Sequence, residues 1–152
     1  EGHWKALKDS INDAEKEITI VSPFISSLAI KHDNLVELFQ KAINRGVKVS
    51  VYTDKWLNSY QVQPKPQFIE GVQMLEAIGV TVYVVERIHN KTICVDNRLL
   101  IEGSFNWLST RRTPGDPWCR YEASFAYTGS EVSDMIKNLL AELEKTKEDK
   151  EL

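Results

Sequence analysis

The stretch RIHNKTICVDNRLLIEGSFNW, residues 87–107, decides how the rest of the chain is interpreted. It contains two apolar runs typical of buried strands, 91–95 and 98–103, joined by Asp96-Asn97, a dipeptide suited to a tight hairpin turn. Polar residues set among Val, Ile and Leu have to be paired or used, because burying them unpaired costs free energy. The polar positions of this hairpin are therefore the first candidates for function.

The spacing of these polar residues predicts that they gather at one place. His89 and Lys91 are two apart, and so are Ser104 and Asn106, so each pair shares one face of an extended chain. If Asp96 and Asn97 are the two turn residues, residue 95 pairs with 98 and His89 falls opposite Ser104. The register predicts a single polar patch at the strand ends.

Such a patch suits a phosphate group. The imidazole of His89 can act as nucleophile or acid, Lys91 supplies a positive charge, and Ser104 and Asn106 can donate hydrogen bonds to phosphoryl oxygens. Each residue alone is better explained as part of a core, with the histidine satisfied by a backbone carbonyl and the lysine reaching water. The four residues together favour a phosphate site.

Size and composition indicate one globular domain. The chain has 152 residues, of which 42% are hydrophobic and 27% charged, so we expect a single domain over residues 1–152. It does not begin with Met, and we therefore also consider a domain excised from a longer protein. The net charge is −3, but residues 87–120 contain six Lys or Arg against three Asp or Glu, a local balance of +3.

The hydrophobic pattern predicts an α/β fold with a mixed β-sheet flanked by helices on both faces. Early strands alternate with helices, whereas the late strands follow one another. We expect helices over residues 4–16, 35–43, 68–78 and 131–147, with Asp33 or Asn34 as the cap and Gly46 as the stop of the second. We expect strands over residues 17–24, 47–54, 80–86, 91–95, 98–103 and 120–127, and loops over 54–66 and 111–118.

The sequence also bears on the compartment. No apolar run approaches membrane-spanning length and the start has no signal-peptide shape, so we expect a cytoplasmic protein without stable membrane association. Cys94 and Cys119 form neither a metal-binding spacing nor a disulfide framework, and we interpret both as free thiols in a reducing compartment.

The polar positions follow a known pattern. The sequence has His89-x-Lys91, then four residues, Asp96, six residues and Gly103-Ser104-x-Asn106. This pattern resembles the signature of the phospholipase D superfamily, in a single-motif, nuclease-like form. The resemblance implies a phospholipase D-like fold. It covers the motif closely and the order of elements from residue 17 to about 143 loosely.

The resemblance implies a role for each residue. His89 would attack phosphorus to form a phosphohistidine, Lys91 and Asn106 would hold the phosphoryl oxygens, and Ser104 would support them. Glu122, in RYEASF, would fix the tautomer of His89. Asp96 belongs to the implied catalytic set, but its place at the turn favours a structural part.

The implied mechanism needs a second histidine, and the chain has one copy of the motif. His3 and His32 lie outside the complete motif and are interpreted as surface or cap residues. Single-copy members of the family form homodimers in which each subunit supplies one histidine and lysine, and we expect the same here. We expect no metal and no other cofactor, because Lys91 and its symmetry mate supply the positive charge.

The preferred activity is that of an endonuclease. The local basic excess suits a polyanion, and Trp56, Tyr60, Trp107 and Trp118 lie where they could stack on unpaired bases or simply pack the loops down. The predicted substrate-binding residues are Lys91, Ser104, Asn106, Trp107, Arg111 and Arg112.

The alternatives to an endonuclease are a phospholipid-hydrolysing enzyme of the phospholipase D kind and a non-catalytic nucleic-acid binding domain. The ending GSFNWLS with its arginine pair resembles domains attached to bacterial helicases and ATPases, which suggests an upstream partner domain of that kind.

Overall fold

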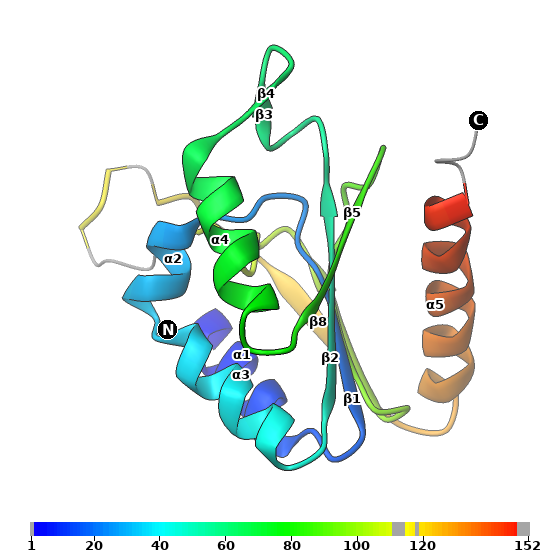
Figure 1. Ribbon diagram of the computed structural model, residues 1–152. Helices are drawn as coiled ribbons and strands as arrows, with labels where there is room; N and C mark the ends of the chain where they lie inside the picture. Colours follow the sequence, from blue (N-terminus) through cyan, green and yellow to red (C-terminus); the bar gives the residue numbers. More distant parts are fainter. Residues whose placement is uncertain (1, 111–114, 118, 149–152) are drawn as a thin grey trace.

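The structure, a computed structural model that describes residues 2–110, 115–117 and 119–148, is organised around a mixed six-stranded sheet (Figure 1). Its strands are β1 (Glu17–Val21), β2 (Lys48–Asp54), β5 (Thr81–Val85), β6 (Lys91–Val95), β7 (Leu99–Gly103) and β8 (Ser124–Tyr127). They lie in the order β5-β2-β1-β6-β7-β8, with β1, β2 and β5 parallel and the other neighbours antiparallel. A separate hairpin is formed by β3 (Ser59–Tyr60) and β4 (Gln63–Pro64).

Helices cover both faces of the sheet. They are α1 (Gly2–Asp13), α2 (Ser27–His32), α3 (Leu35–Asn44), α4 (Pro66–Glu76) and α5 (Val132–Glu148). Figure 1 shows α1 to α4 on one side of the sheet and α5 alone on the other. The predicted fold class, a mixed sheet flanked by helices on both faces, is confirmed.

Burial on both faces explains why the central strands have nearly continuous apolar sequences. Every residue of β6 is buried, as are all residues of β1 and β2 except the first of each. Ile18, Ile20 and Ile93 face α1 to α4 in the larger core, whereas Cys94 and Leu100 pack against residues of α5. Burial raises the pKa of the Cys94 thiol to about 12, so this cysteine stays a protonated thiol.

Several element boundaries differ from the prediction. The short helix α2 was not predicted, because six residues are too few to show a helical period; Ser26 caps it by accepting a hydrogen bond from the Leu28 N–H. The predicted loop 54–66 contains the β3–β4 hairpin, and β8 is shorter than the predicted strand 120–127. Gly46 ends α3 in the left-handed conformation, as predicted, and Asn34 is its cap residue without a capping side-chain hydrogen bond.

The hairpin register is shifted by one residue from the predicted one. Val95 pairs with Leu99 and Lys91 with Gly103, so the connection has three residues instead of two. A two-residue type I′ turn needs positive φ at both central positions, and Asp96 has φ 51° whereas Asn97 does not have positive φ. The prediction that His89 lies opposite Ser104 is therefore wrong, and Ser104 follows the end of the ladder.

Asp96 pins this turn to the start of β1. Its carboxylate accepts hydrogen bonds from the backbone N–H groups of Glu15 (3.1 Å), Lys16 (2.8 Å) and Glu17 (2.9 Å). Burial by itself would raise the pKa of Asp96, but these three donors and the nearby Arg98 outweigh it and hold the pKa below its ordinary value. The carboxylate thus closes the end of the sheet opposite to His89.

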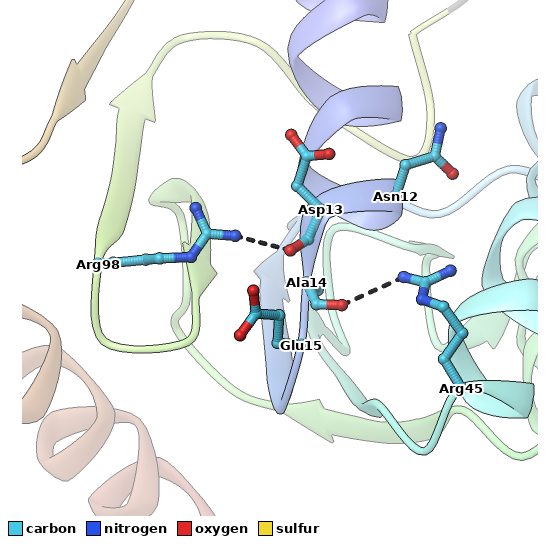
Figure 2. A pocket seen from close by; sticks show the side chains of 6 residues that line it. All are labelled: Asn12, Asp13, Ala14, Glu15, Arg45 and Arg98. Atoms are coloured by element: carbon cyan, nitrogen blue, oxygen red, sulfur yellow. Dashed lines mark hydrogen bonds between the residues drawn. The ribbon is translucent and has the colours of Figure 1, made fainter.

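Two arginines fasten the end of α1 at the same place (Figure 2). Arg98 donates to the carbonyl oxygen of Asp13 at 2.7 Å, and Arg45 donates to those of Ile11 at 2.9 Å and Ala14 at 3.2 Å. The last carbonyls of a helix lack intrahelical partners and carry partial negative charge, which guanidinium groups satisfy. The open pocket at this position is therefore a structural junction between α1, α3 and the β6–β7 turn.

The lowered pKa of Asp96 predicts a pH-dependent loss of stability in Asp96→Asn. An asparagine tolerates the left-handed backbone but lacks the charge, so we expect the variant to be less stable by about 1–2 kcal/mol at pH 7. The difference is complete above the unfolded-state pKa of about 3.9 and disappears as the pH falls through the lower folded-state pKa. Urea unfolding from pH 7 to pH 2.5 measures it.

Asp9→Asn is the matched control, because Asp9 is an exposed carboxylate whose partner Lys5 lies one turn away on α1. Its unfolding midpoint should stay with that of the unmodified chain at every pH. A constant destabilisation of Asp96→Asn across the pH range would contradict the anchoring role of the carboxylate.

Candidate active site

His89 and Lys91 meet at the end of the sheet where β5 ends and β6 begins. His89 is exposed, while Lys91 is only 8% exposed. The Lys91 Nζ donates to the His89 carbonyl oxygen at 2.8 Å and lies 3.3 Å from Nε2 and 3.5 Å from Nδ1 of the same residue. The ammonium group is thus held against an imidazole that faces solvent, an arrangement suited to binding an anion.

Glu122 balances the charge of Lys91. Burial lowers the pKa of Lys91, and the carboxylate of Glu122 acts in the opposite direction. Because Lys91 is buried, its ammonium group is less strongly solvated than that of a surface lysine. A phosphate bound beside it would offset this loss of solvation. The lysine is therefore prepared for an anionic ligand.

Ser104 contacts Glu122 and Ala123, in the segment that leads into β8. Its hydroxyl lies within hydrogen-bond distance of the Glu122 carboxylate and accepts from the Ala123 N–H at 3.1 Å. The Ser104 N–H donates to the Ala123 carbonyl oxygen at 3.0 Å. The preceding Gly103 has no room for a side chain, because a Cβ would overlap Ser124 and the Ala123 carbonyl oxygen.

Two of the predicted site residues make contacts other than those expected from their predicted roles. Glu122 was expected to bond His89, but among the hydrogen bonds of the described residues its carboxylate bonds Ser104. Asp96 ends the opposite side of β6 from Lys91, with its oxygens committed to the start of β1. It cannot touch a phosphate at His89, and its place in the motif is structural.

Asn106 lies in a segment that Ser22 attaches to the end of β1. The Ser22 hydroxyl accepts from the Leu108 N–H at 3.1 Å, and the Ser26 N–H donates to the Leu108 carbonyl oxygen at 3.0 Å. The Asn106 Oδ1 is buried and has no hydrogen-bond partner among the described residues. Because a buried amide oxygen without a partner is costly, a ligand or water that completes its hydrogen bonds would be stabilised here.

Asp54 attaches the His89 loop to the end of β2, and the sequence analysis missed it. The buried carboxylate accepts from the Ile88 N–H at 3.0 Å through Oδ2 and from the N–H groups of Trp56 and Leu57 at 2.8 Å through Oδ1. Asn58 extends the network by donating to the Pro23 carbonyl oxygen at 2.8 Å and accepting from the Ile25 N–H at 3.1 Å. The available signal in the sequence was an Asp at the end of an apolar strand with an Asn four residues later.

The predicted role of Trp107 in substrate binding is wrong. Its ring is 1% exposed and packs edge-on against Phe105 at a centroid distance of 5.2 Å. His3, interpreted from the sequence as a surface or cap residue, stacks on Phe105 at 4.4 Å and hydrogen-bonds the Ser124 hydroxyl at 3.0 Å, so it supports this segment from α1. Arg111, Arg112 and Trp118 lie outside the described residues.

Within residues 2–110, 115–117 and 119–148, no three His, Cys, Asp or Glu side chains gather in a way that could hold a metal ion. None of the helices in the same part of the chain has the length and apolar character needed to cross a membrane.

Replacing the Asp54 anchor should loosen the His89 loop. In Asp54→Asn, the amide can still accept from Trp56 and Leu57, but its NH₂ group then faces the Ile88 N–H, donor against donor. We expect a loss of about 1–3 kcal/mol in unfolding free energy. Amide hydrogen exchange by NMR should show faster exchange at Ile88.

Glu142→Gln, at a position in the middle of α5 whose side chain is 70% exposed, is the control and should leave both measurements nearly unchanged. Unchanged protection of the Ile88 amide in Asp54→Asn would contradict the anchoring of the loop by Asp54.

Solved structures share this fold at low sequence identity. Nuc from Salmonella typhimurium, described as a phospholipase D family member, has a TM-score of 0.70 and 18% identity, covering 93% of this chain and 84% of its own. NucT from Helicobacter pylori has a TM-score of 0.68 and 16% identity, covering 97% and 88%. The archaeal chromatin protein TrmBL2, whose structure is described as showing a novel mode of DNA binding, has a TM-score of 0.60 and 15% identity, covering 95% and 49%.

Comparison of the sequence with curated proteins gives no match. The family model described as cardiolipin synthase, PLD-like domain, matches residues 7–142, which include both halves of the motif and most of α5. The chain therefore belongs to the phospholipase D-like domain family, as its motif implied.

Proposed function

We propose that the protein is a metal-independent phosphodiesterase, an endonuclease that acts through a phosphohistidine at a homodimeric site. The observation that carries this proposal is the exposed imidazole of His89 held beside the buried ammonium of Lys91, with Glu122 and Ser104 adjoining. A nucleophile next to a fixed positive charge is what in-line attack on an anionic phosphodiester requires.

In the proposed reaction an unprotonated nitrogen of His89 attacks phosphorus, and the bond to the leaving oxygen breaks. Lys91 binds a phosphoryl oxygen and stabilises the charge that develops on it, with Asn106 and Ser104 as further ligands. A second imidazole, protonated at the start, donates its proton to the leaving oxygen. Water then attacks the phosphorus of the phosphohistidine and gives a proton to the same second imidazole, while the bond between phosphorus and His89 breaks, which restores both groups.

We propose that the second imidazole is the partner's His89. His3 stacks on Phe105, and His32 lies at the end of α2 with its Nδ1 3.0 Å from Asp33. Both rings thus already have other partners among the described residues. A two-fold axis near the exposed His89 would bring two equal sets of His89 and Lys91 together in a closed dimer.

Nucleic acid is the preferred substrate class. The stretch of residues 87–120, which contains the motif, has a balance of +3 in a chain of net charge −3, and this favours a polyanionic substrate. The fold neighbour TrmBL2 is described as a DNA-binding protein. The alternative substrate is a phospholipid, because the matching family model is described by a cardiolipin synthase.

Cleavage in excess EDTA, compared with His89→Ala, tests the proposal. We expect the unmodified chain to cut labelled DNA or RNA with the chelator present. The rate in His89→Ala should fall by at least about a thousandfold, because the nucleophile is removed. Light scattering on the same sample should give the mass of a dimer.

Tyr127→Ala, at an exposed position on β8, is the control and should cut at the normal rate. Undiminished cutting by His89→Ala would contradict the catalytic role of His89. A dimer that cuts no nucleic acid but hydrolyses phospholipid would support the alternative substrate, and binding without any turnover would support a non-catalytic domain.

The two-imidazole mechanism predicts a bell-shaped pH profile of kcat/KM. One imidazole has to be neutral to attack while the other is protonated to assist departure, so the rate falls on both sides of an optimum near neutral pH. Steady-state rates from pH 5 to pH 9 measure the profile. A rate that rises steadily into alkaline pH would contradict the general acid.

A further inference from the structure

The segment from Lys55 to Lys65 displays its apolar side chains to solvent. Trp56 is 48% exposed, Tyr60 73% and Val62 75%, although side chains of this kind are usually buried. Figure 1 shows the β3–β4 hairpin within this segment projecting past the carboxyl end of β2. The core of the domain does not explain these positions, because Tyr60 and Val62 contribute little to it.

The same segment is firmly attached at its base. Asp54 accepts from the N–H groups of Trp56 and Leu57, and the buried Asn58 donates to the carbonyl oxygens of Pro23 and Asp54. The Lys65 N–H donates to the Asn58 carbonyl oxygen at 2.9 Å, which closes the hairpin. Trp56 and Tyr60 are thus presented on an ordered support, which lowers the entropic cost of binding.

The segment also lies next to the His89 loop. The Lys55 N–H donates to the Val85 carbonyl oxygen at 2.8 Å, at the end of β5. The carboxylate of Asp54 that holds Trp56 also holds the N–H of Ile88, the residue before His89. One buried side chain therefore joins the aromatic segment to the candidate active site.

The charge and polarity of the segment suit a polyanion with flat apolar groups. Residues 55–69 contain two lysines and no Asp or Glu, in a chain whose net charge is −3. The Lys55 Nζ lies 4.6 Å from the centroid of the Trp56 ring and 3.7 Å from the exposed Glu86 carboxylate, so a surface cation sits beside the ring and can exchange this partner for a phosphate. Gln61, Gln63 and Gln67 add exposed hydrogen-bonding groups.

We propose that this segment is a stacking surface for unpaired bases, which makes single-stranded nucleic acid the substrate that the site selects. The inference rests on the proposed nuclease function and deepens it. Bases of a single strand stack on Trp56 and Tyr60, and Lys55 and Lys65 contact the backbone that leads to His89. A duplex keeps its bases stacked inside and gains only the contacts of the lysines.

A membrane surface is the less suitable occupant, because two glutamines flank Val62 at the tip. Inserting the hairpin into lipid would remove Gln61 and Gln63 from water without supplying partners. Single strands leave these amides hydrated or bonded to bases.

The test measures binding without turnover in the His89→Ala background, by fluorescence anisotropy with a labelled oligothymidine and a duplex of equal length. We expect tighter binding of the single strand. Replacing Trp56 and Tyr60 together by Ala should weaken single-strand binding about tenfold or more and leave duplex binding nearly unchanged. Tyr60→Phe keeps the ring and should retain the affinity.

Tyr127→Ala removes an exposed aromatic ring elsewhere and serves as the matched control. The unfolding midpoint of each variant shows that it is folded, as expected for exposed positions. Equal affinity for single strand and duplex, or single-strand binding that the double replacement leaves unchanged, would overturn the proposal. So would binding to phosphatidylglycerol vesicles that depends on Trp56 and Tyr60 without binding to oligothymidine.

Because the assay needs no turnover, its outcome is separate from that of the cleavage test. Loss of the proposed enzyme activity with preserved stacking would leave a single-strand binding domain, whereas cleavage without strand preference would leave a nuclease with another recognition surface.

Discussion

Hydrogen bonding of loop backbone at the carboxyl ends of β1 and β2 is the constraint on which the candidate site depends. Loops that are partly buried cannot leave their N–H groups unpaired without a large loss of stability. Asp54 satisfies this requirement for the loop that carries His89, and Ser22 does so for the segment that carries Asn106. The two halves of the motif, which flank the adjacent strands β6 and β7, are positioned by side chains outside it.

The motif residues therefore divide into two kinds. His89, Lys91 and Ser104 meet with Glu122 at one end of the sheet, where the imidazole remains exposed. Asp96 lies at the other end and uses both oxygens to hold the turn against β1. A residue can thus belong to a signature for chemical reasons or because the strands that bear the chemistry need it.

Much of the architecture could be predicted from the sequence, because buried strands and amphipathic helices have distinct periods. The central strands, the long helices and the hairpin within residues 87–107 all follow from such patterns. The short helix α2 and the β3–β4 hairpin could not be predicted in this way, since segments of six and two residues carry no period. The predicted register of this hairpin was wrong at Asp96. Its hydrogen bonds to residues 15–17, which lie 79 to 81 positions away along the chain, outweighed the local turn preference.

The sequence by itself determined the family, the fold class and the identity of the polar residues, because these depend on residue types and their spacing along the chain. Only the tertiary structure decided which of them meet. It buried Trp107 while leaving Trp56 exposed, directed Glu122 to Ser104, and brought Asp54 to the backbone beside His89. The physical reason is that burial and hydrogen-bond pairing depend on contacts between distant segments, which no local pattern records.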